Sequence, residues 1–402
     1  MTGVEVVNFG CRLNGVESET MARAARAAGH EALVIVNTCT VTAEASRQGR
    51  QAIRAARRRH PAAEIVVTGC AAETEPERFR SMPEVSRLVP NARKTAPESW
   101  ARAGTSTVLQ PLAGDPPGFH TRGFVEIQNG CDHRCTFCII PFGRGASRSV
   151  PLEQIIETVR ARVAAGTREI VLTGVDITSY EAGGLRLGGV VGRLLRAVPE
   201  LERLRLSSLD CIEADPELIE AIGSQPRLMP HLHLSLQSGA DLILKRMKRR
   251  HGRGDAIRFC SELRAARPGL VFGADLIVGF PTETEAHFAE TLDLVHACEL
   301  THLHAFPFSP RTGTPAARMP AVPGEVVKER ASRLRSLGEA RLASHLDRQV
   351  GRKLRVLTER GGRGRSEDFT AVRLGEVAPN LMLDVAIDGH DGRELRGIPV
   401  AA

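Results

Sequence analysis

Short apolar runs rich in Val and Ile alternate along the chain with stretches of helical periodicity. Three such runs open the sequence, at residues 4–9, 32–36 and 64–68, and a helix-compatible stretch follows each of them. This pattern predicts a small parallel β sheet assembled from βα units. Six further strand-like runs follow, at residues 124–128, 170–173, 204–207, 231–236, 272–278 and 302–308. Six consecutive βα units predict a partial, open version of the eightfold (β/α) barrel.

Changes in composition divide the chain into three predicted domains. The first, residues 1–118, ends in a linker rich in Pro, Gly, Ser and Thr. The second, residues 119–349, holds the six βα units and closes with an arginine-rich helical stretch at 324–349. Residues 350–402 have Gly-rich turns and short β-like runs. The predicted fold class is therefore α/β, with a small doubly wound parallel-sheet domain, a partial (β/α)6 barrel and a small all-β barrel.

The composition is that of a soluble globular protein, with 402 residues, of which 42% are hydrophobic and 25% charged. No apolar run approaches the roughly 18 residues that a membrane span needs, so we expect no membrane partner. The first residues, MTGVEVVNFGC, lack the basic and apolar regions of a secretory signal. We therefore expect a cytoplasmic protein, in which nine cysteines indicate metal-binding or catalytic roles rather than disulfides.

Positive charge predominates and is clustered. The net charge is +7 and the pI about 9.1, and arginines gather at residues 47–59, 245–253 and 352–365. Such clusters suit a polyanion, although solvated helix faces would produce the same pattern. Aromatic residues make up only 4% of the chain, which argues against an extended base-stacking surface. In the last domain the candidate contacts to an RNA backbone are Arg352, Lys353, Arg355, Arg360, Arg363 and Arg365.

Two cysteine triplets carry the chemistry that the sequence predicts. Cys131, Cys135 and Cys138 have the spacing C-x3-C-x2-C directly after the first barrel strand, the end where barrel enzymes place their active sites. Three thiolates suit an iron–sulfur cluster with one iron left open, whereas structural zinc asks for four protein ligands. The other triplet, Cys11, Cys39 and Cys70, ends three successive strands. Since these strand ends share one edge of a parallel sheet, the three thiols are expected to converge.

The C-x3-C-x2-C motif, with Phe137 before its last cysteine, resembles the signature of the radical S-adenosylmethionine (SAM) enzymes. The resemblance implies that the open iron binds SAM and that reductive cleavage of SAM generates a radical that abstracts hydrogen. It also suggests SAM contacts at the ends of later strands. These are Thr173, Gly174, Val175, Asp176, Ser207, Gln237, Ser238, Gly279 and Glu283.

With both triplets, the whole chain resembles the methylthiotransferases, a branch of that superfamily. The resemblance implies two [4Fe-4S] clusters, one held by Cys131, Cys135 and Cys138 and the other by Cys11, Cys39 and Cys70. It also implies SAM as co-substrate, a C-terminal barrel of the TRAM type that helps to bind RNA, and the anticodon stem-loop of a tRNA as substrate. We further expect a flavodoxin- or ferredoxin-type electron donor and a monomeric protein.

The branches of this family modify isopentenylated adenosine in tRNA, N6-threonylcarbamoyladenosine in tRNA, or an aspartate of a ribosomal protein. Four segments most resemble the threonylcarbamoyladenosine branch, and they read GCRLNGVESE, HRCTFCIIPFGRGASRSVP, HLHLSLQSGADLILKRMKRRH and GADLIVGFPTETEAHF. Arg12 and Leu13 stand where the aspartate branch usually has Pro-Lys. The expected reaction is methylthiolation of carbon 2 of the modified adenosine next to the anticodon. A zinc-containing RNA-binding protein is the non-enzymatic alternative.

Overall fold

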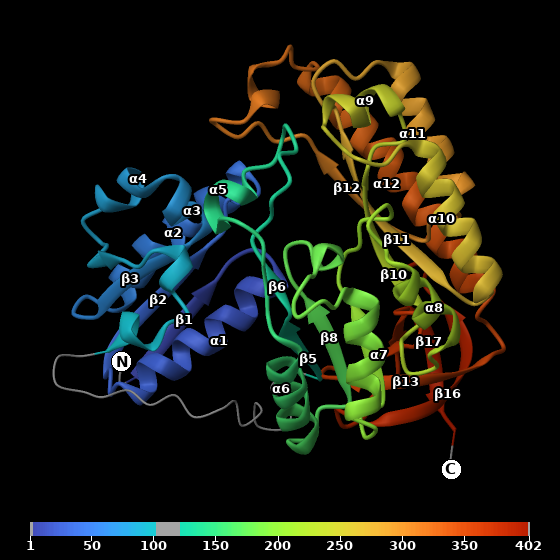
Figure 1. The fold of residues 1–402 in the computed structure, drawn as a ribbon, viewed down its shortest axis with the longest axis horizontal. Helices are drawn as coiled ribbons and strands as arrows, with labels where there is room; N and C mark the ends of the chain where they lie inside the picture. The colour runs from blue at the N-terminus through green and yellow to red at the C-terminus, as the bar shows by residue number, and fades with distance from the viewer. Residues whose placement is uncertain (1–2, 102–120, 401–402) are drawn as a thin grey trace.

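The computed structural model describes residues 3–101 and 121–400. Its described elements form an N-terminal parallel sheet, a central α/β core and a C-terminal β barrel, which confirms the predicted fold class (Figure 1). The domain limits 1–118, 119–349 and 350–402 stay a prediction. The boundary between residues 118 and 119 lies outside the described residues. In the part of the chain that the structure describes, no helix combines the length with the apolarity needed to cross a membrane.

The N-terminal sheet has four parallel strands in the order β1-β2-β3-β4, which are β1 (Gly3–Asn8), β2 (Ala32–Thr38), β3 (Glu64–Gly69) and β4 (Arg87–Leu88). Alternate side chains of β2 point to opposite faces of the sheet. Leu33 and Ile35 pack with the residues of α1 (Arg12–Ala27), whereas Val34 and Val36 pack with those of α2 (Ala43–Arg59). The sheet is thus covered on both faces. The short elements α3 (Cys70–Thr74), α4 (Pro76–Arg80), η1 (Asn91–Arg93) and η2 (Pro97–Trp100) complete this part.

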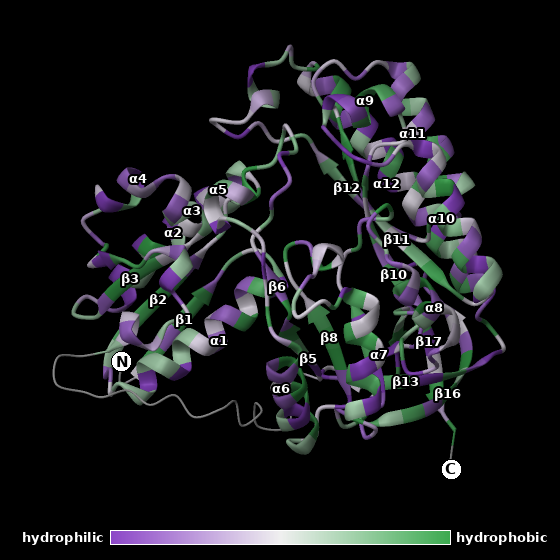
Figure 2. Ribbon diagram, viewed as in Figure 1, coloured by the Kyte–Doolittle hydropathy of each residue, from purple (hydrophilic) through white to green (hydrophobic). Residues whose placement is uncertain are grey.

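The core contains the six predicted strands, arranged as two parallel sheets of three. These strands are β5 (Arg122–Glu126), β8 (Glu169–Thr173), β9 (Arg203–Leu206), β10 (His231–Gln237), β11 (Val271–Val278) and β12 (His302–Pro307). An isolated parallel bridge between Leu209 and Leu234 links the segment after β9 to β10. In Figure 2 the core strand β8 is mostly hydrophobic, while the helices outside the strands carry mixed faces, as expected for a sheet that helices cover.

Helices cover the outside of the open barrel (Figure 1), and all but the last of them connect successive core strands. They are α6 (Leu152–Ala164), α7 (Leu187–Ala197), α8 (Pro216–Ser224), α10 (Arg253–Ala266), α11 (Glu285–Ala297) and α12 (Gly324–Asp347). The shorter elements β6 (Gln128–Asn129), α5 (Ile140–Arg144), β7 (Arg148–Ser149), η3 (Ile177–Ser179), α9 (Asp241–Arg246) and η4 (Pro315–Arg318) lie in the connecting loops. One large apolar cluster packs strands against helices and forms the core of this region.

The C-terminal strands close into a barrel in the order β13-β14-β15-β17-β16. They are β13 (Lys353–Glu359), β14 (Arg363–Ser366), β15 (Ala371–Arg373), β16 (Met382–His390) and β17 (Leu395–Pro399). The barrel is docked on the core strands by arginines. Arg203 donates to the carbonyl of Arg355 at 2.7 Å, and Arg205 donates to the carbonyls of Ser366 and Glu367, both at 2.8 Å.

Candidate functional site

The first cysteine triplet lies along one edge of the N-terminal sheet. Cys11 precedes α1, Cys39 follows β2, and Cys70 begins α3 directly after β3. All three are free thiols. Burial raises the pKa of Cys39, and the neighbouring Cys70 and Cys11 raise it further, because a second negative charge is opposed by the first. The sulfurs of Cys11 and Cys70 therefore lie within electrostatic reach of that of Cys39.

A glycine makes the close approach of Cys11 and Cys39 possible. Gly10 has a φ of +93°, a backbone conformation that disfavours residues with a side chain. A Cβ atom at this position would stand 2.6 Å from the sulfur of Cys39, which is far inside a van der Waals contact. The chain before Cys11 thus passes against Cys39 because residue 10 has no side chain.

The second triplet lies on the loop between β6 and α5, at the carboxyl ends of the core strands. Burial raises the pKa of Cys131 to about 12, and Asp176, Cys138 and Cys135 contribute in the same direction. Burial also raises the pKa of Cys138 to about 11, with Cys135 adding to it. Each thiol thus lies in the field of the other two.

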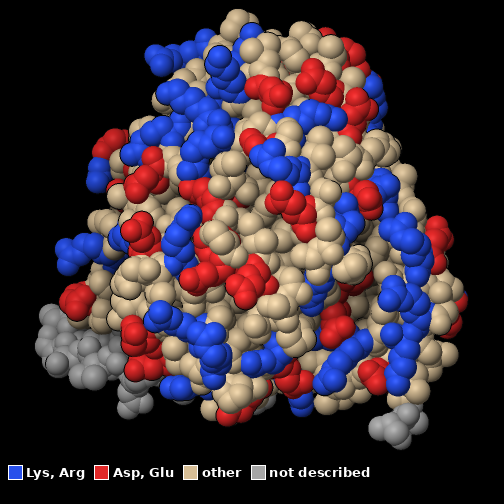
Figure 3. Space-filling view, turned by 45° about the vertical axis from the view of Figure 1, so that its right-hand side comes forward, with Lys and Arg blue, Asp and Glu red and all other residues tan. Residues whose placement is uncertain are grey.

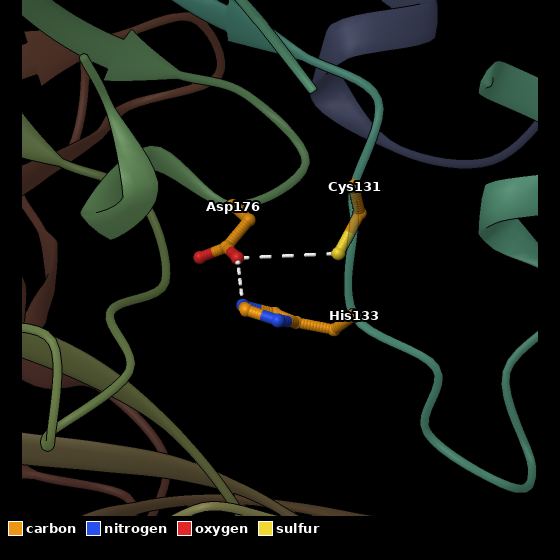
Figure 4. A group of neighbouring side chains, drawn as sticks. All are labelled: Cys131, His133 and Asp176. Atoms are coloured by element: carbon orange, nitrogen blue, oxygen red, sulfur yellow. Dashed lines mark hydrogen bonds and ion pairs between the residues drawn. The ribbon is translucent and has the colours of Figure 1, made fainter. Parts of the chain in front are cut away.

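Cys131 faces a carboxylate from the loop after β8 (Figure 4). The carboxylate of Asp176 lies 3.9 Å from the sulfur of Cys131 and 2.8 Å from Nε2 of His133. Hydrogen bonds to Asp176 and Glu213 raise the pKa of His133 to about 10. His133 therefore holds the carboxylate of Asp176 beside the cysteine loop.

A buried glutamine fixes the same two loops relative to one another. The side-chain oxygen of Gln128 accepts hydrogen bonds from the backbone N–H groups of Val175 and Asp176, at 3.0 and 2.8 Å. Its amide donates to the carbonyl of Gly130 at 2.8 Å. Because Gln128 is fully buried, its hydrogen bonds tie the residues before Cys131 to the predicted SAM-binding segment.

A cavity of about 690 Å³ inside the open barrel brings several predicted residues together. Cys11 enters it from the N-terminal sheet, and Thr173, Gly174, Val175 and Ser207 line it from the ends of the core strands. Arg365 and Phe369 line it from the C-terminal barrel. The cavity is thus the place where the three parts of the molecule meet.

The remaining predicted SAM contacts lie outside the lining of this cavity. The hydroxyl of Ser238 is buried and 3.4 Å from that of Thr291, and Gln237 adopts a φ of +69° at the end of β10. The backbone N–H of Gly279 donates to Glu283 at 2.8 Å, and Arg330 donates to the same carboxylate oxygen at 2.8 Å. The carboxylate of Glu283 thus joins the strand β11 to helix α12.

Comparison with known proteins gives two family matches, the radical SAM superfamily over residues 125–295 and the uncharacterized protein family UPF0004 over residues 3–90. The threonylcarbamoyladenosine tRNA methylthiotransferase MtaB of Rickettsia prowazekii is 44% identical over 92% of this chain and 91% of its own. The chain belongs to the radical SAM methylthiotransferase family.

Two further relatives in this family share less of the sequence. MtaB of Thermotoga maritima is 36% identical over 89% of this chain and 87% of its own. The tRNA-2-methylthio-N(6)-dimethylallyladenosine synthase of Cereibacter sphaeroides is also 36% identical, over 93% of this chain and 92% of its own. Among solved structures, the radical SAM methyltransferase TsrM of Kitasatospora setae superposes with a TM-score of 0.53 at 17% identity, covering 76% of this chain and 69% of that one. That likeness supports the fold alone.

Membership in the radical SAM family implies SAM and iron–sulfur chemistry, and the cysteines fit that chemistry. Thiolates are the ligands of [4Fe-4S] clusters, and both triplets consist of free thiols whose charges interact. The burial that raises these pKa values in the bare protein is offset when iron binds the thiolates, because metal coordination stabilises the deprotonated form.

One cluster of functional residues was not predicted from the sequence. In this methylthiotransferase Arg144, at the end of α5, donates to Glu17 of α1 at 2.9 Å, and Lys94 lies 2.6 Å from the same carboxylate. All three side chains are nearly inaccessible to water. The residues are distant in sequence, so the pattern offered no signal of their contact. This network joins the segment after one cysteine triplet to the helix that begins at the other.

A second unpredicted group lies on the inner face of the core strands. Asp275 of β11 accepts hydrogen bonds from His233 of β10 at 2.8 Å and from His304 of β12 at 3.0 Å. The alternation of His and Leu in HLHLSLQ was the available signal, since every second residue of a strand shares a face. These polar side chains line the barrel cavity.

Proposed function

We propose that the chain is a tRNA methylthiotransferase that acts on carbon 2 of N6-threonylcarbamoyladenosine next to the anticodon. The observation that carries this proposal is the cavity that Cys11 of one triplet shares with Thr173, Gly174 and Val175, which directly precede the Asp176 that contacts Cys131 of the other triplet. A substrate base in that cavity would lie beside Cys11 and close to the segment that contacts Cys131. The names of four relatives, MtaB of Rickettsia prowazekii, Thermotoga maritima, Aquifex aeolicus and Bacillus subtilis, support the choice of substrate.

In this proposal each triplet holds one [4Fe-4S] cluster. Cys131, Cys135 and Cys138 hold the cluster that binds SAM, and Cys11, Cys39 and Cys70 hold the cluster that supplies sulfur. Together the bound groups supply the radical that removes hydrogen from carbon 2, the sulfur that replaces it and the methyl group. A reduced flavodoxin- or ferredoxin-type protein provides electrons, and the protein acts as a monomer.

The protein's own residues position these groups and shield them from water. Gln128 holds the loop of Val175 and Asp176 against the segment before Cys131. The buried contact of Arg144 with Glu17 keeps the two triplets at a fixed separation. Such positioning matters because a misplaced hydrogen donor or sulfur lowers the reaction rate steeply.

The proposal is tested by nucleoside mass spectrometry of tRNA from strains with and without the gene. We expect the deletion strain to lack the methylthio group on threonylcarbamoyladenosine and to retain threonylcarbamoyladenosine itself. Unchanged nucleosides would contradict the proposal, and loss of the methylthio group from isopentenyladenosine instead would reassign the substrate. Incubation with ribosomes tests modification of a ribosomal protein.

Metal analysis of the purified protein separates this enzyme from a zinc-containing RNA-binding protein. After anaerobic reconstitution we expect about eight irons per chain, four for each cluster. Stoichiometric zinc without iron or sulfide in protein purified anaerobically would contradict the proposal.

A further inference from the structure

The end of the cavity nearest the C-terminal barrel is lined by arginines. Four guanidinium groups surround the ring of Phe369, at 6.0, 5.4, 5.1 and 4.8 Å from its centre, and they belong to Arg12, Arg122, Arg205 and Arg365. Two carboxylates stand among them. Glu169 lies 2.9 Å from Arg205 and 3.8 Å from Arg122, and Glu359 pairs with Arg122 and Arg365. We call this group the arginine floor.

Arg12 differs from the other members of the arginine floor because it has no acidic partner among the described residues. Its guanidinium lies 5.4 Å from the ring centre of Phe124 and 6.0 Å from that of Phe369. The side chain can be reached through the cavity. The guanidinium groups of Arg122, Arg205 and Arg365 gather with it around the ring of Phe369, so an anion placed beside Arg12 would meet concentrated positive charge.

Two histidines next to the arginine floor also lack partners. Nε2 of His231 and Nε2 of His302 are buried and make no hydrogen bond within the described part of the chain. Both residues line the cavity, and the ring of His231, which is 91% buried, stacks on Phe369 at 5.1 Å. Buried polar atoms without partners are uncommon in native proteins and point to a missing ligand.

We propose that Arg12 binds the carboxylate of the threonylcarbamoyl group of the substrate adenosine. This inference rests on the proposed function. A planar guanidinium without an acidic partner among the described residues matches a carboxylate, whereas a neutral isopentenyl group would leave Arg12 without an anion. Arg12 also follows Cys11 directly in the sequence, so the residue that anchors the substituent adjoins the triplet assigned to sulfur transfer.

The arginine floor and the predicted SAM-binding segment lie at opposite ends of the core strands. Arg122 and His231 begin β5 and β10, so they mark the amino ends of the core strands. Thr173, by contrast, ends β8 at the carboxyl end, on the side of the Cys131 loop. A carboxylate on Arg12 is therefore the substrate's and not that of SAM.

The test compares two RNA stem-loops in binding to the reconstituted holoenzyme without reductant. One carries threonylcarbamoyladenosine, and the other carries its neutral carboxamide. We expect the wild-type protein to bind the acid at least about tenfold more tightly, the gain of a charge-assisted hydrogen bond. Arg12→Gln is expected to bind both RNAs equally and Arg12→Lys to keep part of the preference. Arg193→Gln, which changes an exposed residue of α7, serves as the matched control.

Three results would overturn the inference. They are equal binding of acid and amide by the wild-type protein, a full preference retained by Arg12→Gln, and loss of SAM binding by Arg12→Gln with the preference intact. Iron content and SAM cleavage without RNA verify that the variant is folded and loaded. If the wild-type protein methylthiolates the acid RNA but fails these tests, the inference alone is wrong; if it modifies no threonylcarbamoyladenosine at all, the proposed function is wrong.

Discussion

Individual residues give the two cysteine triplets different electrostatic surroundings. Burial raises the pKa of Cys70, but Arg144 and Lys94 act against that rise because their charges stabilise a thiolate. At Cys131, Asp176 instead adds to the effect of burial, since its carboxylate opposes a second negative charge. Different neighbours thus serve the two triplets, which suits two clusters with separate tasks.

Substitution of one cysteine from each triplet tests that separation. We expect Cys131→Ala to abolish SAM cleavage, because the cluster that we propose binds SAM would lose a ligand. Cys39→Ala is expected to retain SAM cleavage and to lose sulfur transfer. Both outcomes are measured on reconstituted protein by chromatography of the cleavage products and of the modified nucleoside. A folded Cys39→Ala protein without any SAM cleavage would contradict the division of labour.

At the scale of elements, helix α1 and the short helix α5 are joined by a buried ion pair. Burial raises the pKa of Glu17, but Lys94 and Arg144 outweigh it and hold this pKa below its usual value. The stabilisation that Glu17 provides is therefore present at neutral pH, and it is lost as the pH falls through the lowered pKa of the folded state. The contact also orients both cysteine-bearing segments.

Glu17→Gln leaves two buried cations without a carboxylate. Removal of one partner from a buried ion pair costs roughly 3–5 kcal/mol, so we expect a clear loss of unfolding free energy at pH 7 by denaturant titration. The difference from the wild-type protein should narrow as the pH is lowered, because protonation removes the same charge from Glu17. Glu44→Gln, which breaks an exposed pair with Arg47, is the control and should leave stability unchanged.

At the scale of the whole molecule, the local parts of this architecture were predictable and the contacts between them were not. The nine predicted strands begin and end within two residues of the observed ones. Their boundaries were predictable because an apolar run is a local feature of the sequence. The cysteine spacing likewise revealed the candidate site. The arginine floor, however, combines Arg12, Arg122, Arg205 and Arg365 from three separate parts of the chain.

The C-terminal barrel illustrates that limit. Its basic residues were predicted as contacts to RNA, and several of them have partners within the protein. Arg365 is part of the arginine floor, Arg355 lies 3.4 Å from Glu202, and Lys353 lies 2.9 Å from Asp384. Basic and acidic side chains alternate over the face shown in Figure 3, with basic side chains running down its right-hand edge. Charge counted along the sequence therefore overstates the charge available to RNA.

The barrel contributes Arg365 and Phe369 to the lining of the cavity, and we expect its docking on the core strands to stabilise the fold. Arg203 is 2% exposed and donates to two barrel carbonyls, those of Arg355 at 2.7 Å and Arg365 at 3.2 Å. Lysine has no planar fork and cannot reproduce both bonds, so Arg203→Lys should lower the unfolding free energy by about 1.5–3 kcal/mol. Arg193→Lys controls for the change of residue type. An unchanged unfolding midpoint for Arg203→Lys would mean that the barrel is held by other contacts. If Arg203→Lys instead lowers both the unfolding free energy and the affinity for the substrate RNA, the barrel also forms a wall of the substrate cavity.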